Sequence, residues 1–540
     1  MKVKLILFVI GLAMLSFTIV DYDKYFEITK NIELFANVYK EINANYVDET
    51  NPSKLMKVGI DAMLNSLDPF TNYISEAQIE NYRLMVEGKY NGIGARAKKI
   101  GDYVVITEVY ENFPAHKAGL RAGDQVLTVN KQDAKGKDSE DLNQIMRGTP
   151  KSEVEVSVKR PGQSGILDFK IVRDEVNIPN VPFSGMVDST TGYLCLTTFT
   201  ENAGKNVADA VRNLKKDHPS MSSLIFDLRD NGGGLLHEAV NVCNAFIPQG
   251  TLIASTRSKL KEKDLTYSTR GASVDENIPI VVLINKHSAS ASEIVSGALQ
   301  DLDRAVIMGQ ISYGKGLVQN TKSVGYNAQV KLTIAKYYIP SGRCIQSVNY
   351  VNGQAVHLPD SLRAKFKTRN GRPVYDGGGV KPDVEIPEAN YPEIVQKLID
   401  NNYIFNFCTD YLQKIPTLKS TQEVQFEDFE QFVAYLKNHN FDDRSDLEVK
   451  LDELKIQSEN TKDVNIKEDL TNVQNKLERA QWQQINSNKE LIINLIKEDL
   501  SSRLFFEKGK YEIKLKQDPL IKDAVELLKQ SDKMARVLKP

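Results

Sequence analysis

The segment IPIVVLINKHSASASEIVSGALQDLDRAVIMG, residues 278–309, decides the fold class of this chain. It opens with a continuous run of branched apolar residues, which is typical of a fully buried strand, and closes with a second such run. A helix-like stretch that begins with small residues lies between them. Strand, helix and strand in this order predict a parallel sheet with crossover helices, and the same alternation extends over residues 176–390. We therefore expect an α/β core there.

Further regions flank this core along the 540-residue chain. Apolar residues at helical spacing predict a helical region at 21–87, and strand, turn and short-helix signals predict a compact β-rich domain at 88–175. Residues 391–540 predict a charged helical region, and the part from 441 onward is typical of long, solvated, amphipathic helices in a stalk or dimer arm. The expected architecture is multidomain α/β.

The first twenty residues, 1–20, indicate where the protein is sent. Lys2 and Lys4 precede an unbroken apolar run over 5–20, which is the pattern of an export signal. As a helix, the run spans about 24 Å, short of the roughly 30 Å of membrane hydrocarbon. No Ala-x-Ala cleavage site precedes Asp21, so a retained membrane anchor stays an alternative, as does a buried N-terminal helix. We expect an exported protein, in the periplasm or cell envelope.

Composition excludes several classes of protein. A net charge of −2 argues against nucleic-acid binding through a basic surface. The four cysteines are widely spaced and the six histidines form no HExxH, so neither a disulfide scaffold nor a metal site is predicted. We expect no metal, nucleotide or other cofactor.

Ser288, Ser290 and Ser292 lie where the first strand of the opening segment meets its helix. A serine there exposes its hydroxyl at a helix N-terminus, where unpaired N–H groups and the helix dipole favour a developing oxyanion. A serine in this position, taken alone, is more often an N-cap. The serines therefore need a base before they indicate catalysis.

Lys315 supplies a candidate base. Gly314 and Gly316 on either side let the backbone approach closely and leave the lysine unobstructed. Gln319 shares a face with Lys315 in a strand or in a helical turn. Burial lowers the pKa of a lysine, and a neutral amine can take a proton from a serine hydroxyl. A Ser/Lys pair can thus replace a Ser/His/Asp triad.

Two other interpretations overlap this site. Residues 309–315 read G-x-x-x-x-G-K, but Gly316 stands where a phosphate-binding P-loop needs Ser or Thr, and the following residues look extended. His287 and His237 are alternative bases for a conventional serine hydrolase, although neither has an evident Asp beside it. The Ser/Lys pair is the interpretation we favour.

DLRDNGGG, residues 227–234, follows a predicted strand. Glycines at a strand end permit backbone N–H groups to point at a reacting oxygen, although a plain strand-to-helix turn has the same composition. Spacing alone favours the plain turn.

Together these stretches resemble the carboxyl-terminal-processing, or tail-specific, serine peptidases. The resemblance runs in consistent order over about residues 35–390, through LDPFTNYI (67–74), GKYNGIGAR (88–96), DLRDNGGG (227–234), NKHSASASEI (285–294) and YGKGLVQ (313–319). Two later stretches, YYIPSGRCIQ (337–346) and GGGVKPD (377–383), also look like segments of this family. The chain beyond residue 400 carries little of it.

The resemblance implies a role for each residue of the site. Ser290 becomes the nucleophile, Lys315 the general base and Gln319 the residue that orients the lysine, while Ser288 and Ser292 support them. The oxyanion hole would combine the N–H of Ala291 with that of a glycine, either Gly232 or Gly233. Three residues of the following helix are expected to be structural or to support the catalytic residues, rather than to be catalytic themselves: Glu293, Asp301 and Arg304.

Residues 88–175 look like the PDZ domain of this family. Such a domain adds a chain terminus as a strand to a sheet edge and holds its carboxylate with backbone amides. The resemblance places the carboxylate-binding loop at Asn91, Gly92, Ile93 and Gly94, although the sequence of this loop departs from the usual sequence in PDZ domains. Apolar specificity would come from the helix at 139–147, and Arg147 at its end is a further candidate, either for the ligand or for communication with the active site.

The resemblance predicts an endopeptidase, and residues 1–20 predict that it is exported. It would capture unfolded or C-terminally apolar protein tails and cleave them through an acyl-enzyme. The alternative is a non-catalytic PDZ scaffold or adaptor on a decayed peptidase fold. The helical regions predict self-association as a homodimer or binding of an adaptor protein, and the N-terminal segment predicts membrane contact.

Overall fold

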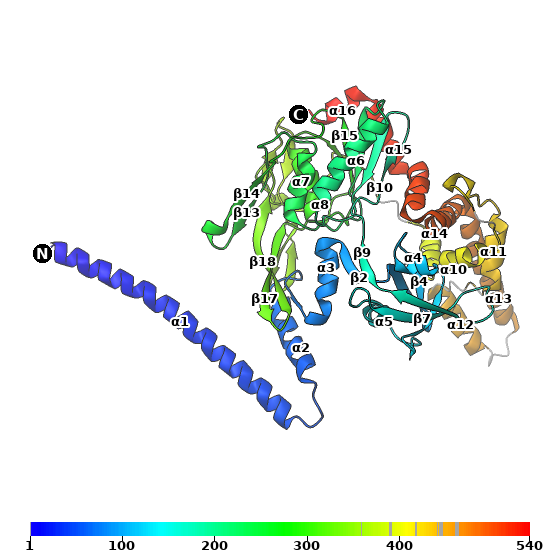
Figure 1. Cartoon of the computed structure of the whole chain (residues 1–540), viewed down its shortest axis with the longest axis horizontal. Coiled ribbons are helices and arrows are strands. Elements are labelled where there is room, and N and C mark those ends of the chain that lie inside the picture. The colour runs from blue at the N-terminus through cyan, green and yellow to red at the C-terminus, as the bar shows by residue number, and fades with distance from the viewer. Residues whose placement is uncertain are drawn as a thin grey trace. The chain divides into compact units, whose positions relative to one another are not determined.

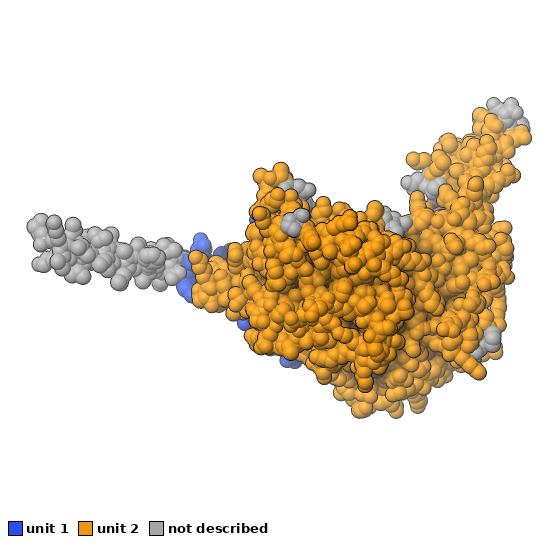
Figure 2. Space-filling model, turned by 90° about the horizontal axis from the view of Figure 1, so that it is seen from above, with its two compact units in different colours: residues 1–76, 319–333, 350–356 blue, residues 77–318, 334–349, 357–540 orange. Residues whose placement is uncertain are grey.

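A computed structural model describes residues 2–539, apart from 358, 388–390, 416–417, 440, 442–445 and 459–463. Within this range, the side chains of residues 2–23 and of a few scattered positions are not described. The apolar run predicted to be an export signal or anchor therefore lies outside the described side chains. The chain divides into two compact units (Figure 2): residues 1–76, 319–333 and 350–356, and residues 77–318, 334–349 and 357–540.

The second unit is built around a six-stranded sheet. Its strands are β10 (Phe183–Met186), β11 (Thr191–Cys195), β12 (Ser223–Asp227), β15 (Ile280–Ile284), β16 (Val306–Gly309) and β23 (Val384–Glu385), in that spatial order. All neighbours pair in parallel except the antiparallel edge strand β10. Every residue of β11, β12, β15 and β16 is buried, because both faces of the sheet are covered. The predicted α/β core is confirmed.

Three crossover helices cover one face of this sheet (Figure 1). They are α6 (Ala203–Asp217), α7 (Leu236–Asn244) and α8 (Ala291–Asp301). Leu194, Phe226 and Val282 of the sheet join the apolar sides of these helices in one core cluster. All of α8 is buried, which makes it the central helix of this face.

The C-terminal helices cover the opposite face. They are the end of α14 (Lys489–Gln517), α15 (Pro519–Lys529) and α16 (Ser531–Val537). Ile521, Ala524 and Leu528 recur at helical spacing and join Ile225 and Leu283 of the sheet in a second core cluster. The expectation of solvated helices in a stalk is therefore wrong for this part of the chain. Its charges lie on the outer sides of helices whose apolar stripes dock on the sheet.

Helix α14 is kinked and joins two cores. Phe505 and Phe506 leave the helical conformation, and Phe506 adopts φ 55° and ψ −152°. Before the kink, Ile492, Ile496 and Leu500 pack in a separate helical core. Its other helices are α9 (Glu393–Asp400), α10 (Tyr403–Tyr411), α11 (Phe429–Asn438) and the end of α13 (Val464–Ser487), and α12 (Asp446–Ser458) pairs with α13.

The β-rich domain is an insertion ahead of the α/β core. Its sheet has β3 (Ala95–Ile100), β4 (Tyr103–Val109), β5 (Gln125–Val129), β7 (Glu153–Lys159) and β8 (Leu167–Val172), with β6 (Gln132–Asp133) beside β5. Helices α4 (Pro114–Ala118) and α5 (Ser139–Met146) complete it. The entering strand β2 (Lys89–Gly92) pairs with the leaving strand β9 (Asp174–Asn177), so both ends of the insertion lie together. Helix α3 (Ile79–Glu87) precedes it.

The remaining elements are divided between the two units. In the second unit, β13 (Leu252–Ser258) pairs with β14 (Leu265–Ser268) and with the end of β18 (Ala328–Tyr338). Short strands β21 (Lys365–Lys367) and β22 (Pro373–Tyr375) belong to the same unit, whereas β19 (Val348–Val351) is divided between the units and β20 (Gln354–His357) lies mostly in the first. The first unit contains α1 (Lys2–Asn45), α2 (Pro52–Asn65), β1 (Asn72–Ile74) and most of β17 (Leu317–Gly325).

Apolar side chains are exposed on the described part of α1. Phe26 and Ile32 are 63% and 65% exposed. A helix long and apolar enough to cross a membrane is not found among the residues whose placement is described.

Docking of the C-terminal helices predicts a site-specific loss of stability. Leu527→Ala removes a buried side chain of α15 and should lower the free energy of unfolding by about 2–5 kcal/mol. Leu454→Ala, at an exposed position of α12, should change it by no more than about 0.5 kcal/mol. Denaturant unfolding of both variants measures the difference. Equal effects would mean that α15 is solvated.

Candidate active site

Ser290 stands at the start of α8, directly after β15. Its φ of 57° and ψ of −112° are unusual for a residue with a side chain, and the residue is half-buried. Such backbone strain persists where surrounding contacts enforce it. The flanking serines supply two of these contacts: the Ser288 hydroxyl donates to the Leu228 carbonyl and the Ser292 hydroxyl to the Asn231 carbonyl, each at 2.8 Å. Both serines thus fasten the helix start to the 227–234 loop.

Asn231 holds the 227–234 loop in place through hydrogen bonds of its side chain and its backbone. It is fully buried, and its carbonyl also accepts the Ala289 N–H at 3.0 Å. Its Nδ2 donates to the Leu196 carbonyl at 2.8 Å, and its Oδ1 accepts the Gly233 N–H at 2.9 Å. This one asparagine therefore fixes the backbone positions of the segment around Ser290 and of the glycines that follow it in the loop.

The two candidate oxyanion glycines differ in position. A Cβ on Gly233 would lie 2.8 Å from Ser290 Cβ and 2.9 Å from the Ala291 nitrogen, and the residue has a φ of +101°. A Cβ on Gly232 would meet nothing within 4 Å. Gly233 therefore adjoins the serine, and its conformation and close contacts both require glycine. Its N–H is held by Asn231, so this donor must be released before it can serve an oxyanion.

Glu293, in the first turn of α8, joins the serine to the lysine segment. Its buried carboxylate accepts the N–H groups of Ser290 at 2.7 Å, Gly314 at 2.6 Å and Lys315 at 2.9 Å, and the Ser312 hydroxyl at 2.5 Å. Burial raises the pKa of this carboxyl to about 7, although the hydrogen bonds oppose the shift. These contacts agree with the expected supporting role, because this one side chain holds the backbone N–H groups of both proposed catalytic residues.

Tyr337 was missed by sequence reasoning. Its buried hydroxyl lies 2.5 Å from the Lys315 carbonyl oxygen and 3.1 Å from that of Ser290. Its backbone N–H donates to the Gly316 carbonyl. The segment 337–346 that carries the resemblance begins at this residue, but nothing in that segment indicates contacts with residues 22 and 47 positions earlier in the chain.

Gly314 and Gly316 are required by close packing around the lysine. A Cβ on Gly314 would lie 2.5 Å from the Ser347 side chain, and one on Gly316 would lie 2.7 Å from the Gln346 nitrogen. Strand β17 follows at Leu317, where a P-loop would start a helix. The nucleotide-binding interpretation of 309–315 is therefore not supported.

Gln319 belongs to the first compact unit, whereas Ser290 and Lys315 belong to the second. Within the first unit, its Nε2 donates to the Thr333 hydroxyl at 3.2 Å. Its proposed action on the lysine stays a prediction.

The alternative bases occupy the surface. His237 is 60% exposed and lies 3.6 Å from a Glu238 oxygen, and His287 is exposed as well. Neither has a hydrogen bond to Ser290 in the part of the chain that the structure describes. The conventional Ser/His interpretation therefore finds no geometric support.

Asp301 and Arg304, the other two predicted supporting residues, hold the end of α8 in place. Asp301 forms a buried ion pair with Arg343 at 2.9 Å. Arg304 donates to the carbonyls of Phe246 and Ile278. Both roles are structural, as the resemblance implied.

The β-rich domain contains a pocket of about 310 Å³ between β3 and α5. Ile93 and Arg147, both predicted to contact the ligand, line it together with Ala95 and Met146. Asn91 accepts the Gly148 N–H through its carbonyl, at 3.4 Å. The loop predicted to hold a carboxylate therefore borders a groove.

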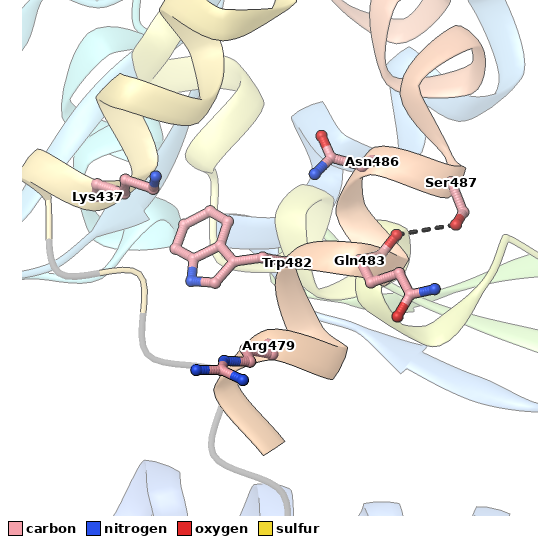
Figure 3. Close-up of a pocket in the computed structure, with 6 residues that line it drawn as sticks. All are labelled: Lys437, Arg479, Trp482, Gln483, Asn486 and Ser487. Atoms are coloured by element: carbon pink, nitrogen blue, oxygen red, sulfur yellow. Dashed lines mark hydrogen bonds between the residues drawn. The ribbon is translucent and has the colours of Figure 1, made fainter. Parts of the chain in front are cut away.

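A second pocket of about 620 Å³ lies in the C-terminal helical region (Figure 3). Trp482 lines it, with the Lys437 ammonium 5.2 Å from its ring. The hydroxyl of Ser487 donates to the Gln483 carbonyl at 2.8 Å. Among the residues described, no group of three or more His, Cys, Asp or Glu is placed to hold a metal ion.

Comparison with known proteins assigns the same three regions. Residues 190–357 match Peptidase family S41, residues 91–171 match the PDZ domain, and residues 394–528 match the C-terminal helical domain of a probable PDZ-protease.

Two curated relatives extend the match. A carboxy-terminal-processing protease of Bartonella bacilliformis is 33% identical over 340 residues, 63% of this chain and 77% of the relative. A probable CtpA-like serine protease of Staphylococcus aureus is 30% identical over 390 residues, 72% of this chain and 71% of the relative. A solved photosystem II D1 C-terminal processing protease is 27% identical, covering 66% of this chain and 94% of its own, with a TM-score of 0.36. The chain therefore belongs to the carboxy-terminal-processing proteases of peptidase family S41, which are serine-type peptidases with a PDZ domain.

Proposed function

We propose that this peptidase captures the C-terminal tails of unfolded proteins in its PDZ groove and cleaves them with Ser290 and Lys315. The observation that carries the proposal is the Glu293 carboxylate, which holds the N–H groups of both residues in one buried cluster. A decayed scaffold would have no need to keep a buried carboxylate in this place, since burying such a group costs free energy. This argues against the non-catalytic alternative.

The proposed reaction has two acyl-transfer steps. The Lys315 amine, in its neutral form, takes the Ser290 proton as the hydroxyl oxygen attacks the peptide carbonyl. The oxyanion then lies at the N-terminus of α8, stabilised by the Ala291 N–H and by that of Gly233 once Asn231 releases it. Lys315 returns the proton to the leaving amine. Water, activated by the same amine, then hydrolyses the ester, and Gln319 is proposed to orient the lysine.

We also propose that the protein works outside the cytoplasm, as a periplasmic or envelope enzyme. The support is Lys2 and Lys4 followed by the apolar run over 5–20. We further propose that the helical regions bind a second copy of the chain or an adaptor protein. The support is the exposed apolar side chains of α1 and of the loop that follows it, such as Phe26 and Val47.

Replacing either member of the dyad tests the mechanism. Ser290→Ala and Lys315→Ala should each reduce cleavage of an unfolded protein by about a thousandfold or more, because the nucleophile or its base is lost. A fluorophosphonate probe should label the wild type and not Ser290→Ala. Ser164→Ala, at an exposed loop position, is the matched control and should cleave normally. Undiminished cleavage by either dyad variant would refute the assignment.

Glu293→Gln tests the shared carboxylate. A glutamine amide would direct N–H groups at some of the four donors, displacing Lys315 from Ser290, so kcat should fall by about 10–100-fold with little change in KM. A structural role would instead lower stability alone. An unchanged kcat in a folded variant contradicts the positioning role.

The pH dependence of stability gives a second measure of Glu293. Its folded pKa of about 7 lies above the ordinary value of 4.5, so the protonated form favours folding. Its stabilising contribution is complete below about pH 4.5 and is lost as the pH rises through about 7. The difference in unfolding free energy between wild type and Glu293→Gln should therefore shift by about 3 kcal/mol from pH 4.5 to 8, against the wild type. A constant difference would show that the carboxyl is ionised throughout.

A further inference from the structure

The loop that carries Gly233 is attached to the C-terminal helices through one arginine. Arg229 stands two residues after the end of β12, and its guanidinium lies between two carboxylates. Its Nη2 donates to Asp227 Oδ2 at 2.6 Å, and its Nη1 lies 2.7 Å from Asp518 Oδ2. The side chains of Arg229, Asp227 and Asp518 are 13%, 2% and 11% exposed, so these charged contacts are largely out of water, where they are strong.

Asp227 fixes one side of this arrangement to the sheet. Its carboxylate also accepts the Tyr193 hydroxyl at 2.8 Å and the backbone N–H of Arg229 at 3.0 Å. Burial alone would raise the pKa of this carboxyl, but the charge and hydrogen bonds of Arg229 hold its pKa below the ordinary value. Asp227 is therefore ionised, and the other arm of the guanidinium is left for Asp518.

Asp518 holds the arginine from a helix that is itself docked on the sheet. Its Oδ1 accepts the Leu520 N–H at 2.9 Å and so caps α15, whose buried Ile521 and Leu528 pack on the sheet. An asparagine caps a helix as well as an aspartate does. Capping therefore does not require a charge at this position, whereas the pairing with Arg229 does.

A shift of Arg229 would reach the proposed oxyanion donor through a short stretch of backbone. Directly before the arginine, the Leu228 carbonyl accepts a serine hydroxyl from the segment that precedes α8. Two residues after it, Asn231 accepts the Gly233 N–H through its side chain and a serine hydroxyl of α8 through its carbonyl. Both neighbours of the arginine thus contact the start of α8, and displacements of about 1 Å in such a site can cost about a hundredfold in rate.

We propose that Asp518 is a positioning residue for the peptidase reaction: through Arg229, it holds the 227–234 loop where the Gly233 N–H can serve the oxyanion. This inference rests on the proposed function. Asp518 touches neither the substrate nor the reacting atoms, so its effect falls on stabilisation of the transition state and not on capture of the substrate. The C-terminal helices then contribute to the rate of cleavage as well as to stability.

Asp518→Asn in the full-length chain tests the proposal, because it keeps the helix cap and removes the charge. We expect kcat for an unfolded protein substrate to fall about tenfold with KM unchanged, since the oxyanion donor is misplaced. The kcat is expressed per active site, counted by complete labelling with a fluorophosphonate, so that unfolded molecules do not contribute. Asp518→Glu keeps the charge and should retain at least about half of the wild-type kcat.

Two variants of the same helix separate positioning from stability. Leu527→Ala lowers stability without touching Asp518 or Arg229, and Lys529→Met breaks the ion pair with Asp188 at 2.8 Å, which joins α15 to the core outside the loop. Both should keep the wild-type kcat per labelled site. An equal fall in kcat for Leu527→Ala would overturn the proposal, as would an unchanged kcat for Asp518→Asn or a kcat for Asp518→Glu as low as that of Asp518→Asn.

Arg229→Lys examines the same contact from the loop. A single ammonium cannot serve both carboxylates as the planar guanidinium does, so kcat per labelled site should again fall about tenfold. Combining it with Asp518→Asn should produce no further fall, because both changes remove one interaction, whereas multiplied effects would contradict the proposal. Cleavage that survived in Ser290→Ala would refute the proposed function itself, so the two failures are distinguishable.

Discussion

The buried carboxylate of Glu293 is the interaction on which the catalytic centre depends. Two segments that are distant in sequence, the start of α8 and the turn before β17, meet because their backbone N–H groups donate to its two oxygens. A charge without water is costly unless hydrogen bonds surround it, and here four donors do so. The same network that offsets the burial cost also fixes the serine relative to the lysine backbone, so stability and geometry have one cause.

The 227–234 loop is held by contacts on both faces of the sheet. On the helix side, Asn231 holds the loop against the start of α8. On the opposite side, Arg229 of the same loop pairs with Asp227 and with Asp518, the N-cap of α15, at 2.6 and 2.7 Å. Removing one partner of such a buried pair costs much more than replacing the pair together. The C-terminal helices are therefore structural partners of the loop that carries Gly233.

The sequence predicted the architecture well where local pattern and tertiary burial agree. The apolar runs of β12 and β15 are recognisable because both faces of the sheet are covered, and the glycines around Lys315 are recognisable because close packing requires them. The amphipathic pattern of the C-terminal helices was recognised, but the pattern alone does not show that the apolar side of α15 packs on the sheet of the same chain. Tyr337 and Asn231 were missed because their roles come from long-range hydrogen bonds. Glu293 had a signal, three residues after Ser290 in the pattern of a capping box, but not its contacts with 312–315.

The PDZ domain and the 227–234 loop both contact the 197–200 segment, which bears on how tail binding relates to cleavage. Strand β2 begins and strand β9 ends close to the 197–200 segment. A Cβ on Gly88, directly before β2, would lie 3.2 Å from the Thr200 hydroxyl, and the Asn180 side chain, shortly after β9, donates to that hydroxyl at 3.0 Å. From there, the buried Phe199 donates its N–H to the Gly233 carbonyl at 3.0 Å. Strand β2 therefore belongs to the same run of contacts as Gly233. A continuous run of contacts of this kind can transmit a conformational change from the PDZ domain to the glycine loop. A difference in the geometry of Gly233 between the empty and the tail-bound protein would show that it does so.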